Sequence, residues 1–240
     1  MREQPEQQAP PVQRLRIRYA KRGRLRFTSH RDFSRAFERA VFRARIPMAY
    51  SSGFNPHPRI SYAGAAPTGS ASEAEYLEIA LAQESDPAQV AEALDGALPE
   101  GLDVLEVVVS GGGSLADRLE ASRWQILLGG VDEEQARAAV EAFLDRDEVT
   151  VERMTKKGLR SFNCREAVLA LSVGTDGEQT ALDVVIRQGS PSVRPDDVLE
   201  GLKSAGGLTF SGAPLHRRLA QGPWDDAAGA LGDPLDADRR

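Results

Sequence analysis

Cysteine and histidine are scarce in this sequence, which has one cysteine, Cys164, and three histidines, at positions 30, 57 and 216. A single cysteine cannot form an internal disulfide, and it cannot by itself hold a zinc ion or an iron–sulfur cluster. Three histidines leave little scope for a histidine-rich metal site. We therefore expect a protein that works without a metal or another cofactor.

Long apolar runs are also missing. No run approaches the ~20 residues of a transmembrane helix, and the N-terminal MREQPEQQAPPVQ lacks the apolar core of a secretory signal. A cytoplasmic protein without a membrane partner is the expectation. Phosphate-cradling loops, dinucleotide-binding fingerprints and serine elbows are absent as well, so no standard catalytic motif marks an active site.

What the chain does have is an uneven distribution of charge. Its net charge is −6, yet residues 14–62 contain 13 basic residues and two acids, which makes this segment +11 and the remainder −17. A strongly basic segment in an acidic protein favours a polyanionic partner, nucleic acid above all. The alternative is that the segment is neutralised internally by the acidic remainder.

Composition divides the chain into five parts. Residues 1–13 are rich in Gln, Pro and Glu and are predicted to be a disordered tail. SGGGS at residues 110–114 is a flexible break, so residues 110–120 are expected to link a basic domain at 14–109 to a second domain at 121–218. Residues 219–240, rich in Gly, Ala, Asp and Pro, are expected to form a flexible acidic tail.

Hydrophobic periodicity predicts the same order of elements in both domains. RLRIRY at residues 14–19 alternates like a half-buried strand, and residues 30–45 carry an apolar face with helical spacing behind Ser29, a candidate N-cap. In the second domain, a basic loop is expected between strands at 149–154 and 167–173, and a last strand near 208–211. Each half is close to βαββαβ, so the predicted fold is α+β, with two tandem ferredoxin-like domains whose antiparallel sheets carry helices on one face.

The candidate binding residues are arginines. Because the apolar side of the first strand must face the helices, Arg16 and Arg18 are expected on an open sheet face, a common platform for single-stranded RNA. On the following helix, Arg31, Arg35 and Arg39 recur every four residues, a spacing at which like charges repel unless an anion lies nearby. Phe42 lies among them, and it either stacks on a base, contacts a protein partner, or packs under the loop at Pro47–Met48.

Two histidines complete the candidate site. His30 lies at the helix start, where backbone N–H groups bind anions, and His57 lies between two prolines, with Arg59 next to it. We assign both histidines and Arg59 to the basic surface. The alternative is a catalytic pair, in which His30 and His57 act as acid and base and Arg59 stabilises the phosphate charge.

Three segments give the chain a recognisable signature: RLRFTSHRDFSRAFERA (24–40), IPMAYSSGFNPHPRIS (46–61) and SEAEYLEI (72–79). They resemble an uncharacterised bacterial family linked to radical S-adenosylmethionine (SAM) proteins, whose members occur fused to such an enzyme or as separate chains. The chain resembles the stand-alone form, and without CxxxCxxC it cannot be the radical enzyme itself. Members often carry Asp-x-Arg where this chain has Asn163-Cys164-Arg165. The first half is also distantly similar to RAMP-type CRISPR repeat-processing endoribonucleases.

These expectations give three alternative functions. The first is a non-catalytic RNA-binding accessory protein that holds tRNA or rRNA for a separate radical SAM enzyme. The resemblance implies that partner, and the basic segment implies the nucleic acid. The second is a metal-independent endoribonuclease that uses His30 and His57. The third is a protein–protein adaptor whose arginine helix docks on an acidic partner.

Overall fold

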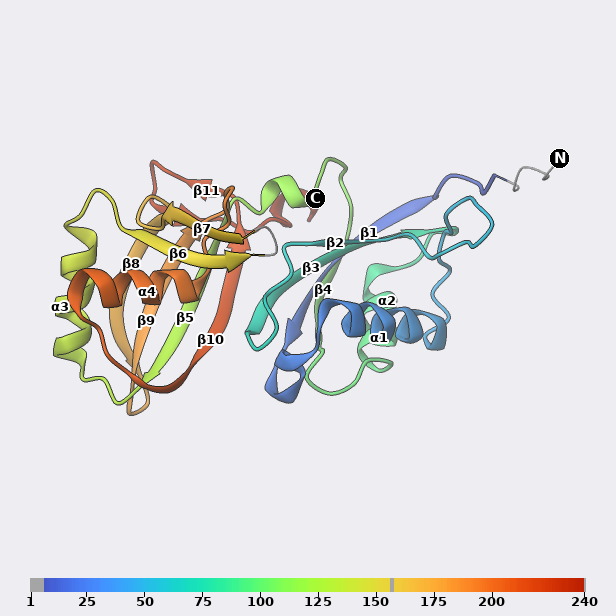
Figure 1. Cartoon of the computed structure of the whole chain (residues 1–240). Helices are drawn as coiled ribbons and strands as arrows, with labels where there is room; N and C mark the ends of the chain where they lie inside the picture. Colours follow the sequence, from blue (N-terminus) through green and yellow to red (C-terminus); the bar gives the residue numbers. More distant parts are fainter. Residues whose placement is uncertain (1–6, 156–157, 240) are drawn as a thin grey trace. The chain divides into compact units, whose positions relative to one another are not determined.

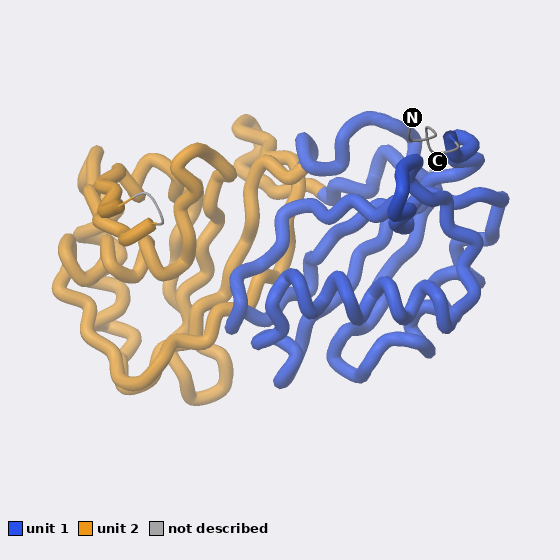
Figure 2. Tube along the Cα trace, turned by 45° about the vertical axis from the view of Figure 1, so that its right-hand side comes forward, with its two compact units in different colours: residues 1–118, 233–240 blue, residues 119–232 orange. Residues whose placement is uncertain are grey.

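The computed structural model describes residues 7–155 and 158–239 and shows a mixed α+β protein with antiparallel sheets (Figure 1). Four α-helices lie within these described residues. The chain forms two compact units, residues 1–118 with 233–240 and residues 119–232 (Figure 2). The second unit is therefore inserted between two parts of the first, and the boundary falls inside the predicted linker.

The first unit follows the order β1, α1, β2, β3, α2, β4. In its sheet, β1 pairs with β3 on one side and β4 on the other, and β2 also pairs with β3, all antiparallel. The elements are β1 (Gln13–Lys21), the 3-10 helix η1 (Gly23–Phe27), α1 (His30–Arg43), β2 (Ile60–Ala63), β3 (Ala71–Leu81), α2 (Pro87–Asp95), β4 (Val104–Val109), and the 3-10 helices η2 (Ala116–Arg118) and η3 (Asp236–Asp238).

The core of the first unit lies between the sheet and its helices. Leu15, Ile17 and Tyr19 from β1 are buried with Phe33 and Phe37 from α1. The Tyr19 and Phe33 rings stack with their centroids 4.6 Å apart. The alternation of β1 therefore sends its apolar side chains toward the helices, as the sequence predicts, and its arginines to the opposite face.

The second unit has a sheet in which β5 lies between β9 and β10, with β8 on the far side of β9 and all pairings antiparallel. Gly206 of α4 packs tightly on α3 at Ala139. The elements are β5 (Ala121–Gly129), α3 (Glu133–Leu144), β6 (Thr150–Thr155), β7 (Gly158–Asn163), β8 (Val168–Asp176), β9 (Gln179–Arg187), α4 (Pro195–Gly206), β10 (Ser211–Gly222), β11 (Trp224–Asp225) and β12 (Ala230–Leu231).

One expectation for the second unit is corrected. The basic connection after β6 contains the strand β7, which pairs with β6 as a hairpin, the plainer of the interpretations of this basic patch. The last strand lies at Ser211–Gly222 instead of 208–211, because Gly207 closes α4 in a left-handed conformation and the chain then needs several residues to reach β5. Two register shifts against β5 interrupt the pairing of β10, which obscures any alternation in its sequence.

The flexible acidic tail predicted from residue 219 is also corrected. These residues contain the end of β10, the β11–β12 pair and η3, up to the described end of the chain at Arg239. Leu235 and Asp238 are buried. The predicted disordered tail at 1–13 falls partly outside the described residues, at 1–6. Within 7–13, the Gln8 N–H donates to Ser52 Oγ at 3.0 Å, and Gln13 begins β1.

Candidate nucleic-acid interface

The helix α1 presents its arginines to solvent because its opposite, apolar side packs into the core. Ser29 caps the helix by accepting a hydrogen bond from the Asp32 N–H at 3.2 Å. The apolar side chains at i, i+4, i+7 and i+8 are buried, and they are Phe33, Phe37, Ala40 and Val41. The opposite side carries Arg31, Arg35 and Arg39, all exposed. We call these three residues the arginine face.

The arginine face has no internal neutralisation within the described part of the chain. None of its three guanidinium groups has an ion pair or hydrogen bond there, in contrast to Arg14, Arg22 and Arg123. Like charges four residues apart on a helix repel by a few tenths of a kcal/mol per pair. The repulsion along this surface is therefore not relieved by an ion pair of these three arginines among the described residues.

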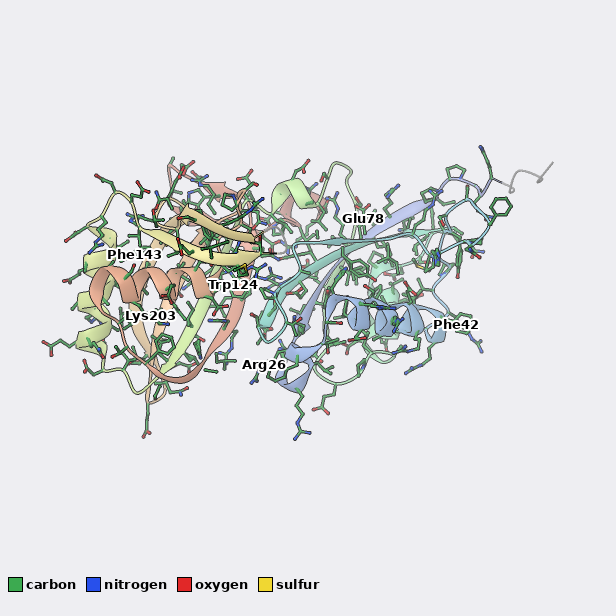
Figure 3. The ribbon with its side chains drawn as sticks, in the orientation of Figure 1. Arg26, Phe42, Glu78, Trp124, Phe143 and Lys203 are labelled. Carbon is green, nitrogen blue, oxygen red and sulfur yellow. The ribbon has the colours of Figure 1, made fainter. Side chains whose placement is uncertain are left out.

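Phe42 extends the arginine face toward the C-terminal end of α1 (Figure 3). Its side chain is 83% exposed and lines a surface hollow together with Arg35, Glu38, Arg39 and Arg43. Of the interpretations of this residue, the structure supports an exposed aromatic ring and not packing under the loop. An exposed phenyl ring beside arginines is a typical platform for stacking a base.

The loop that contains His57 is held by its own hydrogen bonds. The Ser51 N–H donates to the His57 carbonyl at 2.9 Å, and the His57 N–H donates to Ser51 Oγ at 3.1 Å. Arg59 Nε donates to the Tyr50 carbonyl at 3.0 Å, which leaves this guanidinium half-buried. His57 is exposed, and so is Phe54 at 71%. The loop therefore presents these side chains from a fixed backbone.

His30 and His57 lie near opposite ends of α1. The His30 ring begins the helix and meets the Tyr62 ring edge-on, with centroids 4.9 Å apart. Pro58, next to His57, instead lines a groove with Phe42 and Arg45 at the other end. Twelve residues of helix separate positions 30 and 42, or about 18 Å at 1.5 Å per residue. The two histidines are thus not brought together as an acid–base pair, which requires hydrogen-bond reach to one substrate atom.

Arg16 is not part of an exposed surface, which corrects its assignment as a phosphate ligand. Its side chain is completely buried, and Nη1 donates to both carboxylate oxygens of Asp238 at 2.8 and 3.0 Å. Nη2 donates to the carbonyls of Gly112 and Gly113, and Nε donates to Glu78. All five N–H donors of the guanidinium are therefore used inside the protein.

Arg18 also turns out to be engaged. It is half-buried, and its Nε donates to the Glu73 carbonyl at 2.9 Å. The prediction for Arg16 fails because the helix-free face of β1 is covered at this position. Residues 110–113 and 233–239 of the same unit pass over it, and Asp238 fixes both by also accepting from the Gly111 N–H and from Arg118.

The Asp238 carboxyl is the most strongly engaged acid in this covering layer. Burial raises its pKa, but hydrogen bonds from Arg16, the Gly111 N–H and Arg118 outweigh burial and hold the pKa below its usual range. Arg118 Nη1 donates to it at 2.6 Å. The Asp238 carboxyl is therefore ionised at neutral pH and serves as the counter-ion of Arg16. Among the described residues, no carboxylate forms such an ion pair with the arginine face.

Sequence reasoning missed three residues near the exposed surface: Arg45, Tyr50 and Phe54. Tyr50 is 42% exposed and, like Arg45, lines the groove at the end of α1. Arg45 adopts a left-handed φ of 54°, which is unusual for a residue other than glycine. The prolines around these residues predict a turn, but no local pattern indicates that it folds back on α1.

Two further sequence expectations concern metals and membranes. Across residues 7–155 and 158–239, no group of three or more His, Cys, Asp or Glu side chains is arranged to hold a metal ion. None of the helices in this part of the chain has the length and apolar character needed to cross a membrane.

The fold and surface together define a mixed α+β protein with an unneutralised arginine face on its first helix. The sequence matches the family described as "Uncharacterized protein conserved in bacteria (DUF2344)" over residues 14–195, and the chain belongs to this family. A search of curated proteins finds no match.

Similarity to solved structures is weak. A chain of a Cbf5-Nop10-Gar1 complex is 11% identical with a TM-score of 0.45; the match covers 90% of this chain and 55% of that one. This chain thus spans about half the length of that structure. The first two RRM domains of the yeast poly(U)-binding protein Pub1 are 14% identical with a TM-score of 0.23, covering 85% of this chain and 98% of that one. Neither similarity carries an argument about function.

Proposed function

We propose that this protein binds RNA through the arginine face of α1. The observation that carries the proposal is that Arg31, Arg35 and Arg39 are exposed side by side without a partner among the described residues, next to the exposed ring of Phe42. Phosphates would neutralise the repulsion along the helix and release counter-ions, which makes such binding favourable and sensitive to salt.

Four other predicted residues would contribute at the margins of this surface. His30 lies at the N-terminal end of α1 beside Arg31 and would add a hydrogen bond to a phosphate, at the end of the helix where the macrodipole favours an anion. His57 is exposed on the loop beyond the other end, and Arg59 follows it. Arg16 is no longer included because all five of its donors are used internally. Arg18 stays a candidate at the margin, as Arg59 does, because in each only Nε donates to a backbone carbonyl among the described residues, that of Glu73 and that of Tyr50.

The proposed partner and location follow from the family resemblance. A separate radical SAM enzyme would modify tRNA or rRNA that this protein holds, and the protein itself would be non-catalytic. The complex would work in the cytoplasm. The separate positions of His30 and His57 support an accessory role over an endoribonuclease.

We also propose that both units are ferredoxin-like domains in tandem. In the first unit, the element order βαββαβ and the strand order β4-β1-β3-β2 support this assignment. In the second unit, β10-β5-β9-β8 is the equivalent order, with the β6–β7 hairpin as an insertion.

A salt titration tests the RNA proposal. Fluorescence anisotropy of labelled tRNA and rRNA fragments is measured with the wild type and with the triple variant Arg31→Gln, Arg35→Gln and Arg39→Gln. We expect the triple variant to lower affinity and to reduce the slope of log K against log salt by about 0.7 for each lost contact to a single strand.

The control is Arg137→Gln in α3, an exposed arginine on a helix that is already paired with Glu133. It should leave affinity unchanged. An absence of RNA affinity, or an affinity independent of salt, contradicts the proposal. Co-purification with a radical SAM enzyme that persists after ribonuclease treatment, without RNA affinity, would instead identify a protein adaptor.

A further inference from the structure

A groove opens at the C-terminal end of α1, directly beyond the arginine face. It is lined by Phe42 of α1 and by Tyr50 and Pro58 of the following segment. Ile46 and the buried Met48 also line it, and its volume is about 570 Å³, within the usual range for ligand sites. The groove thus combines apolar lining residues with two exposed aromatic rings, those of Phe42 and Tyr50.

We propose that this groove holds one unpaired base of a single-stranded RNA, an inference that rests on the proposed function and specifies its substrate class. Bases stack favourably on aromatic side chains, whichever base is present. Phe42 and Tyr50 offer two such rings in one depression. This is the arrangement that a phosphate-binding helix alone would lack.

The spacing of the charges supports an RNA strand that runs along α1 into the groove. Arg31, Arg35 and Arg39 are each four residues apart, which corresponds to about 6 Å along the helix axis. Phe42 follows one turn after Arg39 on this side of the helix. A strand whose phosphates meet the arginine face therefore brings a neighbouring base to Phe42.

The rim of the groove supplies hydrogen-bonding groups of both kinds. Glu38 offers carboxylate oxygens that accept from the amino and ring N–H groups of a base, and Arg45 offers donors to its carbonyls. Such groups recognise the edge of a base that is free of its pairing partner.

Arg45 is held at the rim in a conformation that normally belongs to glycine. The residue after a helix C-cap often adopts a left-handed φ, and here Arg45 does so at 54°. Its N–H donates to the Phe42 carbonyl at 3.1 Å, and the Ile46 N–H donates to the Val41 carbonyl at 3.1 Å. A side chain other than glycine is strained in this region, and strain of this kind clusters at binding sites.

These features favour a single strand over a duplex. In an A-form duplex the bases are paired and stacked inside the helix, so only phosphates and groove edges reach a protein surface. The arginine face would bind both forms, but the groove adds affinity only for a base that is splayed out. The proposal therefore predicts a preference that the arginine face alone would not produce.

The test uses the full chain and three labelled RNAs: a single strand, the same strand annealed to its complement, and the single strand with one abasic position. Anisotropy should show tighter binding of the intact single strand than of the other two. Phe42→Ala and Tyr50→Ala should each weaken single-strand binding by about tenfold and leave duplex binding unchanged. A 2-aminopurine base in the strand should lose fluorescence on binding the wild type, and less with Phe42→Ala.

The matched control is Phe27→Ala. Phe27 is also exposed, at 59%, and has Arg26 over its ring, but it lies in η1 before α1 and outside the groove. It should bind like the wild type. Circular dichroism of each variant verifies folding, and Phe42→Trp, which keeps an aromatic face, should restore affinity.

Two results separate the failure of this inference from that of the proposed function. The groove proposal alone fails if single strand and duplex bind equally well. It also fails if Phe42→Ala and Tyr50→Ala leave the affinity unchanged while the arginine triple variant still loses affinity. If none of the RNAs binds in a salt-dependent way, the RNA-binding function itself fails.

Discussion

Asp238 and Arg16 form a fully buried ion pair although 222 positions separate them in the sequence. Nη1 of Arg16 donates to both carboxylate oxygens, and two glycine carbonyls and Glu78 take the remaining donors. Because the charges are both paired and hydrogen-bonded, neither is left without compensation in the interior. The pair ties residues 233–239 to β1.

The first prediction concerns the removal of Asp238 from its ion pair with Arg16. Asp238→Ala should lower the free energy of unfolding by about 3–5 kcal/mol, because it leaves the Arg16 charge buried without its main counter-ion. Urea unfolding followed by circular dichroism measures the change. Asp236→Ala is the control: Asp236 belongs to the same segment but its side chain is 70% exposed, so its loss should cost less than about 1 kcal/mol. Equal effects of the two variants would contradict the role given to Asp238.

The second prediction concerns pH. Although burial raises the pKa of Asp238, the hydrogen bonds that it accepts lower the pKa overall. A carboxyl with a depressed folded-state pKa stabilises the protein above its unfolded pKa, near ~3.9, and this contribution is lost as the pH falls through the folded value. The stability difference between wild type and Asp238→Ala should therefore be largest at neutral pH and shrink below about pH 4. Urea titrations of both proteins at neutral pH and below about pH 4 check this. A stability difference between wild type and Asp238→Ala that grows in acid would refute the prediction.

The third prediction distinguishes two exposed helical arginines by the sign of their effect on stability. Arg39 has Arg35 and Arg43 one turn away on either side and no acid three or four residues away, so Arg39→Gln should raise the free energy of unfolding by a few tenths of a kcal/mol. Arg137 is paired with Glu133 four residues earlier, so Arg137→Gln should lower it by a similar amount. Replicate urea titrations resolve the two signs. Destabilisation by Arg39→Gln would show that this arginine has an intramolecular role.

The fourth prediction tests the packing of α3 against α4. A Cβ atom added at Gly206 would lie 2.4 Å from Ala139 Cα and 2.9 Å from its Cβ. Gly206→Ala should therefore destabilise the protein by about 1–3 kcal/mol, because the overlap exceeds the gain of about 1 kcal/mol in helix propensity. Gly174→Ala in β8, where no heavy atom lies within 4 Å, should be tolerated. Thermal unfolding of both variants provides the comparison.

The fifth prediction concerns Cys164. Burial, with a smaller contribution from Asp197, raises the pKa of this thiol to about 11. The thiolate is the reactive form, so the native protein should be inert to a thiol-specific reagent at neutral pH and should react once unfolded in urea. Labelling is followed by mass spectrometry. Rapid labelling of the native protein would show that Cys164 is not a buried thiol with a raised pKa.

Local patterns in the sequence predict the first helix and the first strand well. The helical spacing from Phe33 to Val41, the cap at Ser29 and the alternation of Leu15 and Ile17 all depend on neighbours within one or two turns. These signals also predict correctly which side of α1 is exposed. Phe42 lies outside the apolar spacing, but this pattern alone leaves open whether its ring is exposed or packs under the loop at Pro47–Met48, and the structure shows it exposed.

The covering of the β1 arginines cannot be predicted in this way. Alternation places Arg16 on the helix-free face, but what lies over that face depends on Asp238, which no local pattern connects to β1. The segment that carries Asp238 is rich in Gly, Ala and Asp, a composition that favours a loop. The groove depends similarly on Tyr50 folding back toward Phe42, a relationship between a helix and a turn that spacing alone does not specify.

The division of the first unit into residues 1–118 and 233–240 has a consequence for synthesis of the chain. While the ribosome makes residues 119–232, Asp238 has not yet been synthesised, so Arg16 lacks its ion-pair partner. The first unit therefore cannot reach its complete structure during this time. Domains generally fold as units during synthesis, N-terminal ones first. Here the second unit can complete its folding before the first. In any chain that stops before residue 238, the Arg16 guanidinium lacks its buried counter-ion, so we expect the first unit to be unstable and prone to degradation.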